Sequence, residues 1–301
     1  MDKNKWTTAS IPDQKGNIII ITGANSGLGF AATKILSQQN ATVIMAVRNM
    51  DKGEQALMEV KKITPNANLS LMKLDLSDLD SINAFAKAFS GKYDTLNILI
   101  NNAGLMYPPK REETKQGFEI QIGTNHLGHF ALTGLLFDLI KKTPKSRVVT
   151  QSSLAHINAD IRLDDLNWEK TYSKRQAYGQ SKLANLLFTY ELDRKFKEHN
   201  INSIATAAHP GISKTNLMLT SSNIFQMFTH LVAQKPETGA LSIIRAATDE
   251  QLTGGEYIGP SRLGGMRGFP ELIKSSNKSY DVKLAKELWV VSEKMTGVHF
   301  K

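Results

Sequence analysis

The chain has 301 residues, 41% of them apolar, and is therefore long enough to bury a sizeable core. It contains no cysteine, which excludes disulfides, thiolate catalysis and thiolate metal sites and is typical of a reducing cytoplasm. The formal net charge of +9 is spread along the chain, which favours anionic ligands such as nucleotide phosphates and argues against nucleic acid binding.

No linker rich in proline, glycine or serine divides the chain, so we expect a single domain over residues 1–301. Residues 1–17 are polar and lack the apolar core of a signal peptide. No run of about 18 apolar residues follows, which argues against integral membrane association. We therefore expect a cytoplasmic protein.

A buried strand and a glycine-rich turn come first. Residues 17–22 form a continuous apolar, β-branched run, which is typical of a strand covered by helices on both faces of a parallel sheet. The glycines that follow let the backbone approach a pyrophosphate at a helix N-terminus, where unpaired amides and the helix dipole favour negative charge. The sequence therefore predicts a nucleotide site that contains Thr22, Gly23, Asn25, Ser26, Gly27, Leu28 and Gly29.

The second expected strand, residues 41–47, ends beside Arg48. In dinucleotide sites an acidic residue about 20 residues beyond the glycines binds the ribose 2′-hydroxyl of NAD, whereas an arginine accommodates the 2′-phosphate of NADP. Val47 and Arg48 offer no acid and one guanidinium, so we predict NADP(H) in preference to NAD(H). A solvated arginine at a strand end is the alternative.

Strands and helices continue to alternate along the chain. We expect a helix over residues 51–63, a strand over 69–74, a helix over 80–89 and a strand over 96–100. This repetition predicts an α/β fold with a single doubly wound parallel sheet, Rossmann-like, and helices on both faces. In such a fold, ligands bind outside the carboxyl ends of the strands.

Polar residues follow two of these strands at that edge. Asp75 and Leu76 come after one strand, and Asn101-Asn102-Ala103-Gly104 after the next. Asp75 could accept a hydrogen bond from the adenine amino group, and Gly104 would let the loop pass close to the ribose. Turn chemistry explains both residues equally well.

A long helical pattern spans residues 115–141 and contains Asn125, an amide in an apolar environment that needs hydrogen-bond partners. His126 and His129 are three residues apart and raise the question of a metal site. Because no third ligand accompanies them, we favour roles in packing or at the helix surface and expect no metal.

The next strand, residues 147–150, ends in Gln151-Ser152-Ser153 and precedes a helix that carries Tyr178 and Lys182. The four-residue spacing stacks these two side chains on one helical face. An ammonium beside the phenolate lowers the pKa of tyrosine, but a shift of about three units needs roughly 4 kcal/mol, more than one exposed pair supplies. We therefore expect a partly desolvated cleft and a second cation, such as an oxidised nicotinamide.

Elements of the C-terminal part follow the same alternation. We expect a strand over residues 202–207, a loop over 209–215, a helix over 238–248, a short last strand over 256–258 and a helix over 281–295. Residues 217–231 are rich in Met and Phe, which indicates either core or an apolar lid over a substrate.

Together these motifs resemble the short-chain dehydrogenase/reductase family over about residues 17–258. The motifs that carry the resemblance are Thr22-Gly23-x-x-x-Gly27-x-Gly29, Asp75-Leu76, Asn101-Asn102-Ala103-Gly104, Asn125, Ser153, Tyr178-x-x-x-Lys182 and Pro210-Gly211. The text around them, including Asn125-His-Leu-Gly-His-Phe130 and His209-Pro-Gly211, is most similar to the retinol dehydrogenase-like branch.

The resemblance implies a catalytic tetrad of Asn125, Ser153, Tyr178 and Lys182. Tyr178 would be the acid in carbonyl reduction and the base in alcohol oxidation, and Lys182 would lower its pKa and hold the nicotinamide ribose. Ser153 would hydrogen-bond the substrate oxygen, and Asn125 would support a water chain to Lys182. Ser152 also ends the strand, but Ser153 matches the position of the family.

Cofactor contacts are implied as well. Beyond the glycine turn and Arg48 they are Asp75, Leu76, Asn102, Ala103, Gly104, Tyr178 and Lys182, with Pro210, Gly211 and Thr215 at the nicotinamide carboxamide. The resemblance further suggests a homodimer or homotetramer, although the long C-terminal segment could alter the usual interfaces.

Two departures concern the substrate, whose pocket we expect between loop regions at about 154–175 and 212–235. Ser153 and Tyr178 are 25 residues apart, longer than in compact family members, so an insertion with Leu166, Trp168 and Tyr172 is expected to line or cover the substrate mouth. Many retinol dehydrogenases carry a membrane anchor and none is visible here, which argues against a retinoid.

The leading hypothesis is an NADP(H)-dependent oxidoreductase that interconverts a small apolar aldehyde or ketone and its alcohol. The alternative is a regulator that senses NADPH on the same fold without significant catalysis. A third hypothesis, peripheral membrane binding, depends on the net charge and on the stretch rich in Met and Phe.

Overall fold

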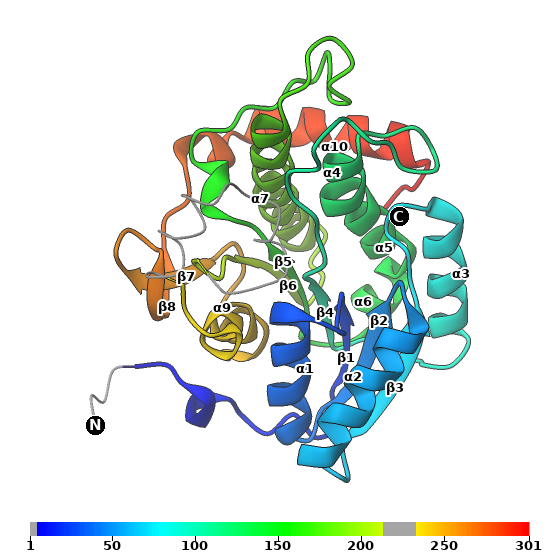
Figure 1. The fold of residues 1–301 in the computed structure, drawn as a ribbon, viewed down its shortest axis with the longest axis vertical. Helices are drawn as coiled ribbons and strands as arrows, with labels where there is room; N and C mark the ends of the chain where they lie inside the picture. Colours follow the sequence, from blue (N-terminus) through cyan, green and yellow to red (C-terminus); the bar gives the residue numbers. More distant parts are fainter. Residues whose placement is uncertain (1–4, 213–232, 301) are drawn as a thin grey trace.

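The computed structural model describes residues 5–212 and 233–300, which contain one twisted sheet of eight strands (Figure 1). The strand order is β3-β2-β1-β4-β5-β6-β7-β8, and every pairing is parallel except that of β7 with β8. The strands are β1 (Ile18–Thr22), β2 (Thr42–Val47), β3 (Asn68–Lys73), β4 (Ile98–Asn101), β5 (Ser146–Gln151), β6 (Ser203–Ala208), β7 (Tyr257–Arg262) and β8 (Arg267–Ile273).

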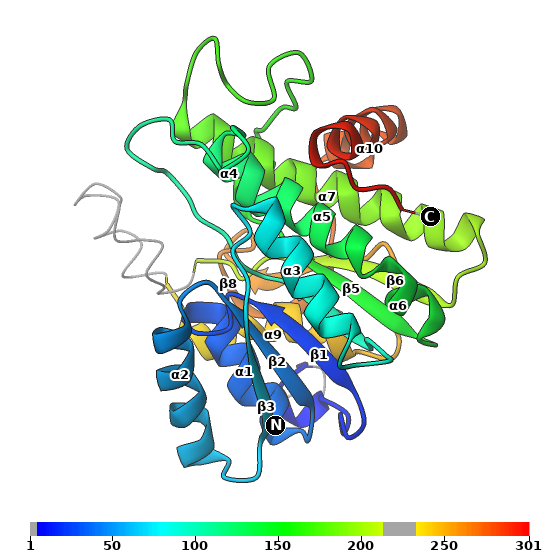
Figure 2. The same ribbon diagram turned by 90° about the vertical axis from the view of Figure 1, so that its right-hand side faces the viewer.

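Helices cover both faces of this sheet, which confirms the doubly wound α/β fold (Figure 2). Helices α1, α2 and α9 pack on one face and α3, α5 and α7 on the other. The described helices are α1 (Gly27–Gln38), α2 (Met50–Ile63), α3 (Leu79–Ser90), α4 (Ile120–Ile122), α5 (Gly128–Leu135), α6 (Phe137–Lys142), α7 (Lys174–Glu198), α9 (Pro236–Thr248) and α10 (Val282–Thr296). None of them is long and apolar enough to cross a bilayer.

Strand β1 shows why the apolar runs become central strands. Ile19 and Ile21 face the cluster that contains α1 and α9, whereas Ile20 faces the cluster of α3, α5 and α7, and all three are fully buried. A strand needs apolar side chains on both faces when helices cover both. The chain winds outward in both directions from the neighbouring strands β1 and β4, so the carboxyl ends of these strands meet at a topological switch point.

Two expectations about secondary structure are wrong. The sheet is not wholly parallel, because the short last strand expected at 256–258 is longer and turns back into the antiparallel β8. The long helix expected over 115–141 is interrupted. Residues 115–119 are not helical, α4 passes into a π-helical turn at Gly123–Leu127, and α5 and α6 follow.

The C-terminal segment lies outside the layer formed by α5 and α7 (Figure 2). Trp289 of α10 packs its ring 5.1 Å from that of Phe130 and 5.7 Å from that of Phe188, centroid to centroid. Phe300 lies 4.5 Å from Trp289 and 5.0 Å from Phe130. The expected helix at 281–295 is therefore present, and its apolar face covers α5 and α7.

Candidate active site

The turn between β1 and α1 has the backbone conformation that its glycines allow. Gly23 and Gly27 have φ angles of +68° and +54°. A Cβ on Gly29 would lie 2.3 Å from the Gly23 carbonyl oxygen and 2.6 Å from Asn102 Nδ2, so only glycine fits there. Ser26, the N-cap of α1, makes no capping hydrogen bond with its side chain, so the first amides of the helix stay available to an anion. This cradle fits a dinucleotide pyrophosphate. Asn25 lies in the same turn, and Leu28 lies in the first turn of α1.

Thr22 ties this turn to the loop that follows β4. Its Oγ1 accepts hydrogen bonds from the backbone amides of Asn102 and Ala103, both at 2.9 Å. Asn102 Nδ2 in turn donates to the Thr22 carbonyl oxygen at 2.8 Å. His129 Nδ1 donates to the Asn125 carbonyl oxygen at 3.0 Å, so its Nε2 accepts from the Thr22 hydroxyl at 2.9 Å.

Thr22→Val should lower the free energy of unfolding by about 2 to 4 kcal/mol, because the isosteric side chain leaves the Ala103 amide and His129 Nε2 without a partner. The measurement is urea unfolding followed by circular dichroism. Thr42→Val is the matched control, since Thr42 bonds only the exposed Asn68 side chain at the start of β2, and its effect should stay within about 0.5 kcal/mol. Equal effects of the two substitutions would contradict the role of Thr22.

The two histidines of this region are packing residues in the described chain. Burial lowers the pKa of His126 to about 3 and that of His129 to about 4, so both are neutral at physiological pH. His126 Nε2 lies 2.9 Å from Ser292 Oγ of α10. No group of three or more His, Cys, Asp or Glu side chains among the described residues could hold a metal ion.

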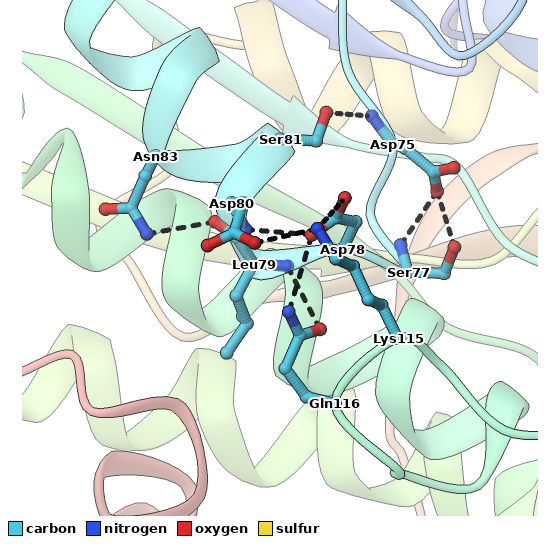
Figure 3. Close-up of polar contacts among 9 residues, drawn as sticks. All are labelled: Asp75, Ser77, Asp78, Leu79, Asp80, Ser81, Asn83, Lys115 and Gln116. Carbon is cyan, nitrogen blue, oxygen red and sulfur yellow. Dashed lines mark hydrogen bonds and ion pairs between the residues drawn. The ribbon is translucent and has the colours of Figure 1, made fainter.

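Arg48 and Asp75 stand at the edge where the adenosine half of a dinucleotide would lie. Arg48 directly follows β2, is exposed, and has no ion pair or hydrogen bond of its side chain within residues 5–212 and 233–300. Asp75 Oδ1 accepts from the amide and hydroxyl of Ser77, at 2.9 and 2.6 Å (Figure 3). The Asp75 side chain therefore stabilises the turn that follows β3, and its contact with adenine stays a prediction. Leu76 is buried, with its carbonyl oxygen against Gly128.

A polar cluster beside Asp75 fastens the loop before α4 to the start of α3 (Figure 3). Asp78 caps α3 by accepting from the Asp80 amide at 3.0 Å. Lys115 Nζ lies 3.2 Å from Asp78 Oδ2 and 2.8 Å from Asp80 Oδ2. Gln116 Oε1 accepts from the Leu79 amide at 3.2 Å. These contacts hold one end of the segment whose other end follows Gly104.

Asn125 has all its partners inside the protein. Its Oδ1 accepts from the Leu105 amide at 2.9 Å, and its Nδ2 donates to the Leu105 carbonyl oxygen and to Ser181 Oγ, both at 3.0 Å. The π-helical turn places this amide against the loop after β4. A Cβ on Gly104 would lie 3.0 Å from Asn125 Oδ1 and 3.5 Å from Lys182 Nζ, so this glycine lets loop, amide and lysine approach one another.

Ser153, Tyr178 and Lys182 come together where β5 ends. Ser153 follows the strand, and its side chain lies near the phenol of Tyr178. Tyr178 and Lys182 lie one turn apart on α7, with Lys182 Nζ 5.6 Å from the centre of the tyrosine ring. Lys182 Nζ also donates to the Gln151 carbonyl oxygen at 3.2 Å. Ser152 donates its hydroxyl proton to the Lys182 carbonyl oxygen at 2.9 Å and therefore cannot donate it to a substrate oxygen.

Burial sets the pKa values of this pair in opposite directions. Burial raises the pKa of Tyr178 to about 12, and the nearby Ser153 side chain only partly opposes this rise. Burial lowers the pKa of Lys182 to about 8. The residues of the chain by themselves therefore keep the phenol protonated, and Lys182 alone does not depress the pKa of Tyr178.

The loop after β6 is fixed to the turn between β7 and β8. Gly211 has φ +65°, and a Cβ there would lie 2.3 Å from the Met266 carbonyl oxygen. That oxygen accepts from the Ile212 amide at 2.8 Å, and the Pro210 carbonyl oxygen accepts from Gln234 Nε2 at 2.8 Å. Thr215 and the stretch 217–231 lie outside the described residues, as does most of the loop region 212–235.

The insertion between Ser153 and Tyr178 packs largely against the rest of the protein. Leu166 is buried against α7, and Trp168 is buried with the Arg162 guanidinium 3.9 Å from its ring centre. Tyr172 donates to Glu119 Oε1 at 3.4 Å, which joins the insertion to the N-cap of α4. Leu166 and Trp168 are therefore buried side chains beside the site, and their part in covering the substrate mouth stays a prediction.

Tyr107 is a site residue that the sequence patterns do not reveal. Its ring lies 5.2 Å from that of Tyr178 at 72°, edge to face. Its backbone has φ +58°, and its amide donates to Gln121 Oε1 at 2.9 Å. The contact between the two rings depends on the left-handed backbone conformation of Tyr107 in the loop after Gly104. No hydrophobic periodicity in the sequence predicts that conformation.

Comparison with known proteins agrees with this geometry. A family model described as short chain dehydrogenase matches residues 17–223. Retinol dehydrogenase 12 of Mus musculus is 37% identical, with 98% of this chain and 90% of that protein covered, and human polyprenol dehydrogenase is 35% identical, with 95% and 87% covered. An uncharacterized protein from Mycobacterium paratuberculosis is 39% identical with a TM-score of 0.83, covering 99% of this chain and all of its own. A short chain dehydrogenase from Shigella flexneri complexed with NADP has the same fold, at 21% identity and TM-score 0.65, with 81% and 97% covered.

Proposed function

Because the chain belongs to the short-chain dehydrogenase/reductase family and is similar to its retinol dehydrogenase-like members, we propose that it is an NADP(H)-dependent oxidoreductase that interconverts an aldehyde or ketone and its alcohol. The family membership supports oxidoreductase chemistry at alcohol and carbonyl groups. The observation that carries the proposal is the phenol of Tyr178, which lies near Ser153 and one helical turn from the buried Lys182.

Each side chain has a distinct task in this chemistry. The nicotinamide cofactor supplies or accepts the hydride when it is bound. Tyr178 gives its proton to the substrate oxygen in reduction and takes it back in oxidation, while Ser153 hydrogen-bonds the same oxygen. With a pKa of about 12, Tyr178 holds its proton at neutral pH, which is the form that acts as the acid in reduction. Lys182, with a pKa of about 8, is still largely cationic at pH 7.

The cofactor fits the residues at the carboxyl edge of the sheet. The turn at Gly23, Gly27 and Gly29 brings backbone amides to a pyrophosphate, and Gly104 opens the approach to a ribose beside Lys182. Arg48, exposed and without an acidic partner in the described residues, would bind the 2′-phosphate of NADP(H).

Arg48→Asp should weaken NADPH binding by about ten- to a hundredfold, because a charge-assisted hydrogen bond is worth about 1.5 to 3 kcal/mol and the new carboxylate repels the phosphate. The measurement is titration of NADPH and NADH by nucleotide fluorescence. NADH affinity should not fall. Lys62→Asp makes the same charge change at the far end of α2 and serves as the control. A wild-type protein that prefers NADH would refute the assignment of Arg48.

Relatives named retinol dehydrogenase and polyprenol dehydrogenase support an apolar alcohol or carbonyl compound as the substrate. The test is a panel of aldehydes, ketones and quinones with NADPH or NADH, followed by the loss of reduced-nicotinamide absorbance. Turnover that prefers NADPH and disappears in Tyr178→Phe supports the proposal. NADPH binding without turnover of carbonyls, or of alcohols with NADP⁺, would favour a sensor instead.

A further inference from the structure

The turn that joins β7 to β8 lies at the edge of the sheet (Figure 1) and carries an exposed apolar side chain. Leu263 is 57% exposed although it is a large hydrophobic residue. Its φ angle is +52°, in the left-handed region that residues with a branched side chain rarely adopt. Gly264 and Gly265 follow, also with positive φ, so the tip is a short loop that holds Leu263 outward.

Two arginines frame this apolar tip. Arg262 and Arg267 face each other directly in the antiparallel register of β7 and β8. Like charges at such a position are destabilising. Both residues are exposed, and neither has an ion pair with an acidic side chain within the described residues. The next acidic residue of β8, Glu271, lies four residues along the strand, about 13 Å away at the usual rise. The repulsion is therefore not compensated within the described chain, and an external anion would relieve it.

A second apolar side chain lies beside the same tip. Ile157, in the turn after Ser153, is 53% exposed. Together with Gly264, Gly265, Ile273 and Lys274 it lines a cavity of about 310 Å³. Two glycines of the tip, Ile157 and the exposed Lys274 thus lie around one cavity.

We propose that the tip, residues 262–267, docks on an anionic lipid bilayer. Leu263 enters the interface, and Arg262 and Arg267 bind the headgroups. A bilayer is the occupant to which the tip is complementary, because the exposed Leu263 stands between two exposed arginines, an apolar side chain that can enter the interface flanked by cations that attract anionic headgroups. The overall charge of +9 acts in the same direction.

Docking at this place would set the bilayer next to the candidate active site. The carbonyl oxygen of Met266, within the tip, binds the loop after Gly211. A Cβ on Gly265 would lie 3.3 Å from the side chain of Leu154, the residue after Ser153. An apolar substrate dissolved in the bilayer would therefore reach the site over a short distance.

The test is co-sedimentation of the full chain with phosphatidylcholine vesicles that do or do not contain phosphatidylserine. We expect binding only with phosphatidylserine, and its loss at high salt. Arg262→Gln combined with Arg267→Gln should weaken partition about thirtyfold, at about fivefold for each arginine. Leu263→Asn should also weaken it, and it should fold normally because asparagine tolerates a positive φ. A thermal melt checks the fold of each variant.

Lys61→Gln combined with Lys62→Gln makes the same change of net charge at the exposed end of α2 and is the control. Met58→Asn, at a residue 60% exposed on that helix, is the control for Leu263. Both controls should keep wild-type partition. Absence of wild-type binding, or equal losses in control and tip variants, overturns the proposal. The assay contains neither nicotinamide nor carbonyl substrate, so its outcome is independent of the proposed oxidoreductase reaction.

Discussion

Tyr178→Phe should lower kcat/KM for carbonyl reduction by about 10² to 10⁴-fold, the usual contribution of a general acid. The structure sets this phenol beside Ser153 at the carboxyl end of β5. Removing its oxygen takes away the proton that the developing alkoxide needs. The ring remains, so its edge-to-face contact with Tyr107 is kept.

The same substitution should leave binding and folding nearly unchanged, which separates a chemical role from a structural one. NADPH affinity, measured by fluorescence titration, should stay within about twofold, and the free energy of unfolding should fall by no more than about 1 kcal/mol for one hydrogen bond. Tyr93→Phe is the matched control, because its hydroxyl donates only to Ser70 Oγ, at 3.2 Å, far along the chain from α7. Full turnover in Tyr178→Phe would contradict the mechanism.

The central strands can be predicted from the sequence because their burial on both faces requires apolar residues at successive positions. Ile18–Thr22 is apolar at every position except the last. Such a continuous apolar run is required only in a strand that is covered on both faces. Strand β8 lacks such a signal. It contains Gly268 and Pro270, which normally argue against a strand, and it is tolerated as an edge strand that pairs only with β7.

Some features of the candidate site can likewise be predicted from the sequence, and others cannot. Glycines whose positions exclude any Cβ, such as Gly29, are visible in the sequence because no other residue fits. The π-helical turn at Gly123–Leu127 cannot be predicted from the sequence. It is accompanied by a hydrogen bond between Asn125 and the Leu105 amide, and this contact forms only in the folded chain. The pKa of Tyr178 also escapes prediction, because it depends on burial beneath neighbours that the spacing of Tyr178 and Lys182 does not specify.

Lys182→Met should abolish most of the turnover and at the same time stabilise the protein. Lys182 is only 4% exposed, and burial lowers its pKa from 10.5 to about 8. In the folded protein its ammonium therefore costs free energy at pH 7, and a methionine of similar length removes that cost. The Gln151 carbonyl oxygen keeps the hydrogen bond from Asn185 Nδ2 at 2.9 Å, so no buried acceptor is left without a partner.

The pH dependence of the free energy of unfolding shows that the charged Lys182 destabilises the folded protein. Below about pH 8 both the folded and the unfolded chain hold the lysine proton, and the folded state bears the full cost of burial. Between about pH 8 and 10.5 the unfolded chain still binds the proton that the folded chain has released, so the free energy of unfolding rises with pH, by an amount on the order of 3 kcal/mol. Lys182→Met should lose this rise and should be more stable than the wild type at pH 7.

Urea unfolding of the protein without added nucleotide, at neutral pH and again at about pH 9.5, measures both quantities. Lys87→Met on the surface of α3 is the control and should change neither the stability nor its slope with pH. A Lys182→Met protein that is less stable than the wild type at pH 7 would show that the lysine is held for structure. The expected result, a more stable and nearly inactive protein, would show that the chain keeps a buried cation at a cost in stability because the chemistry beside Tyr178 needs it.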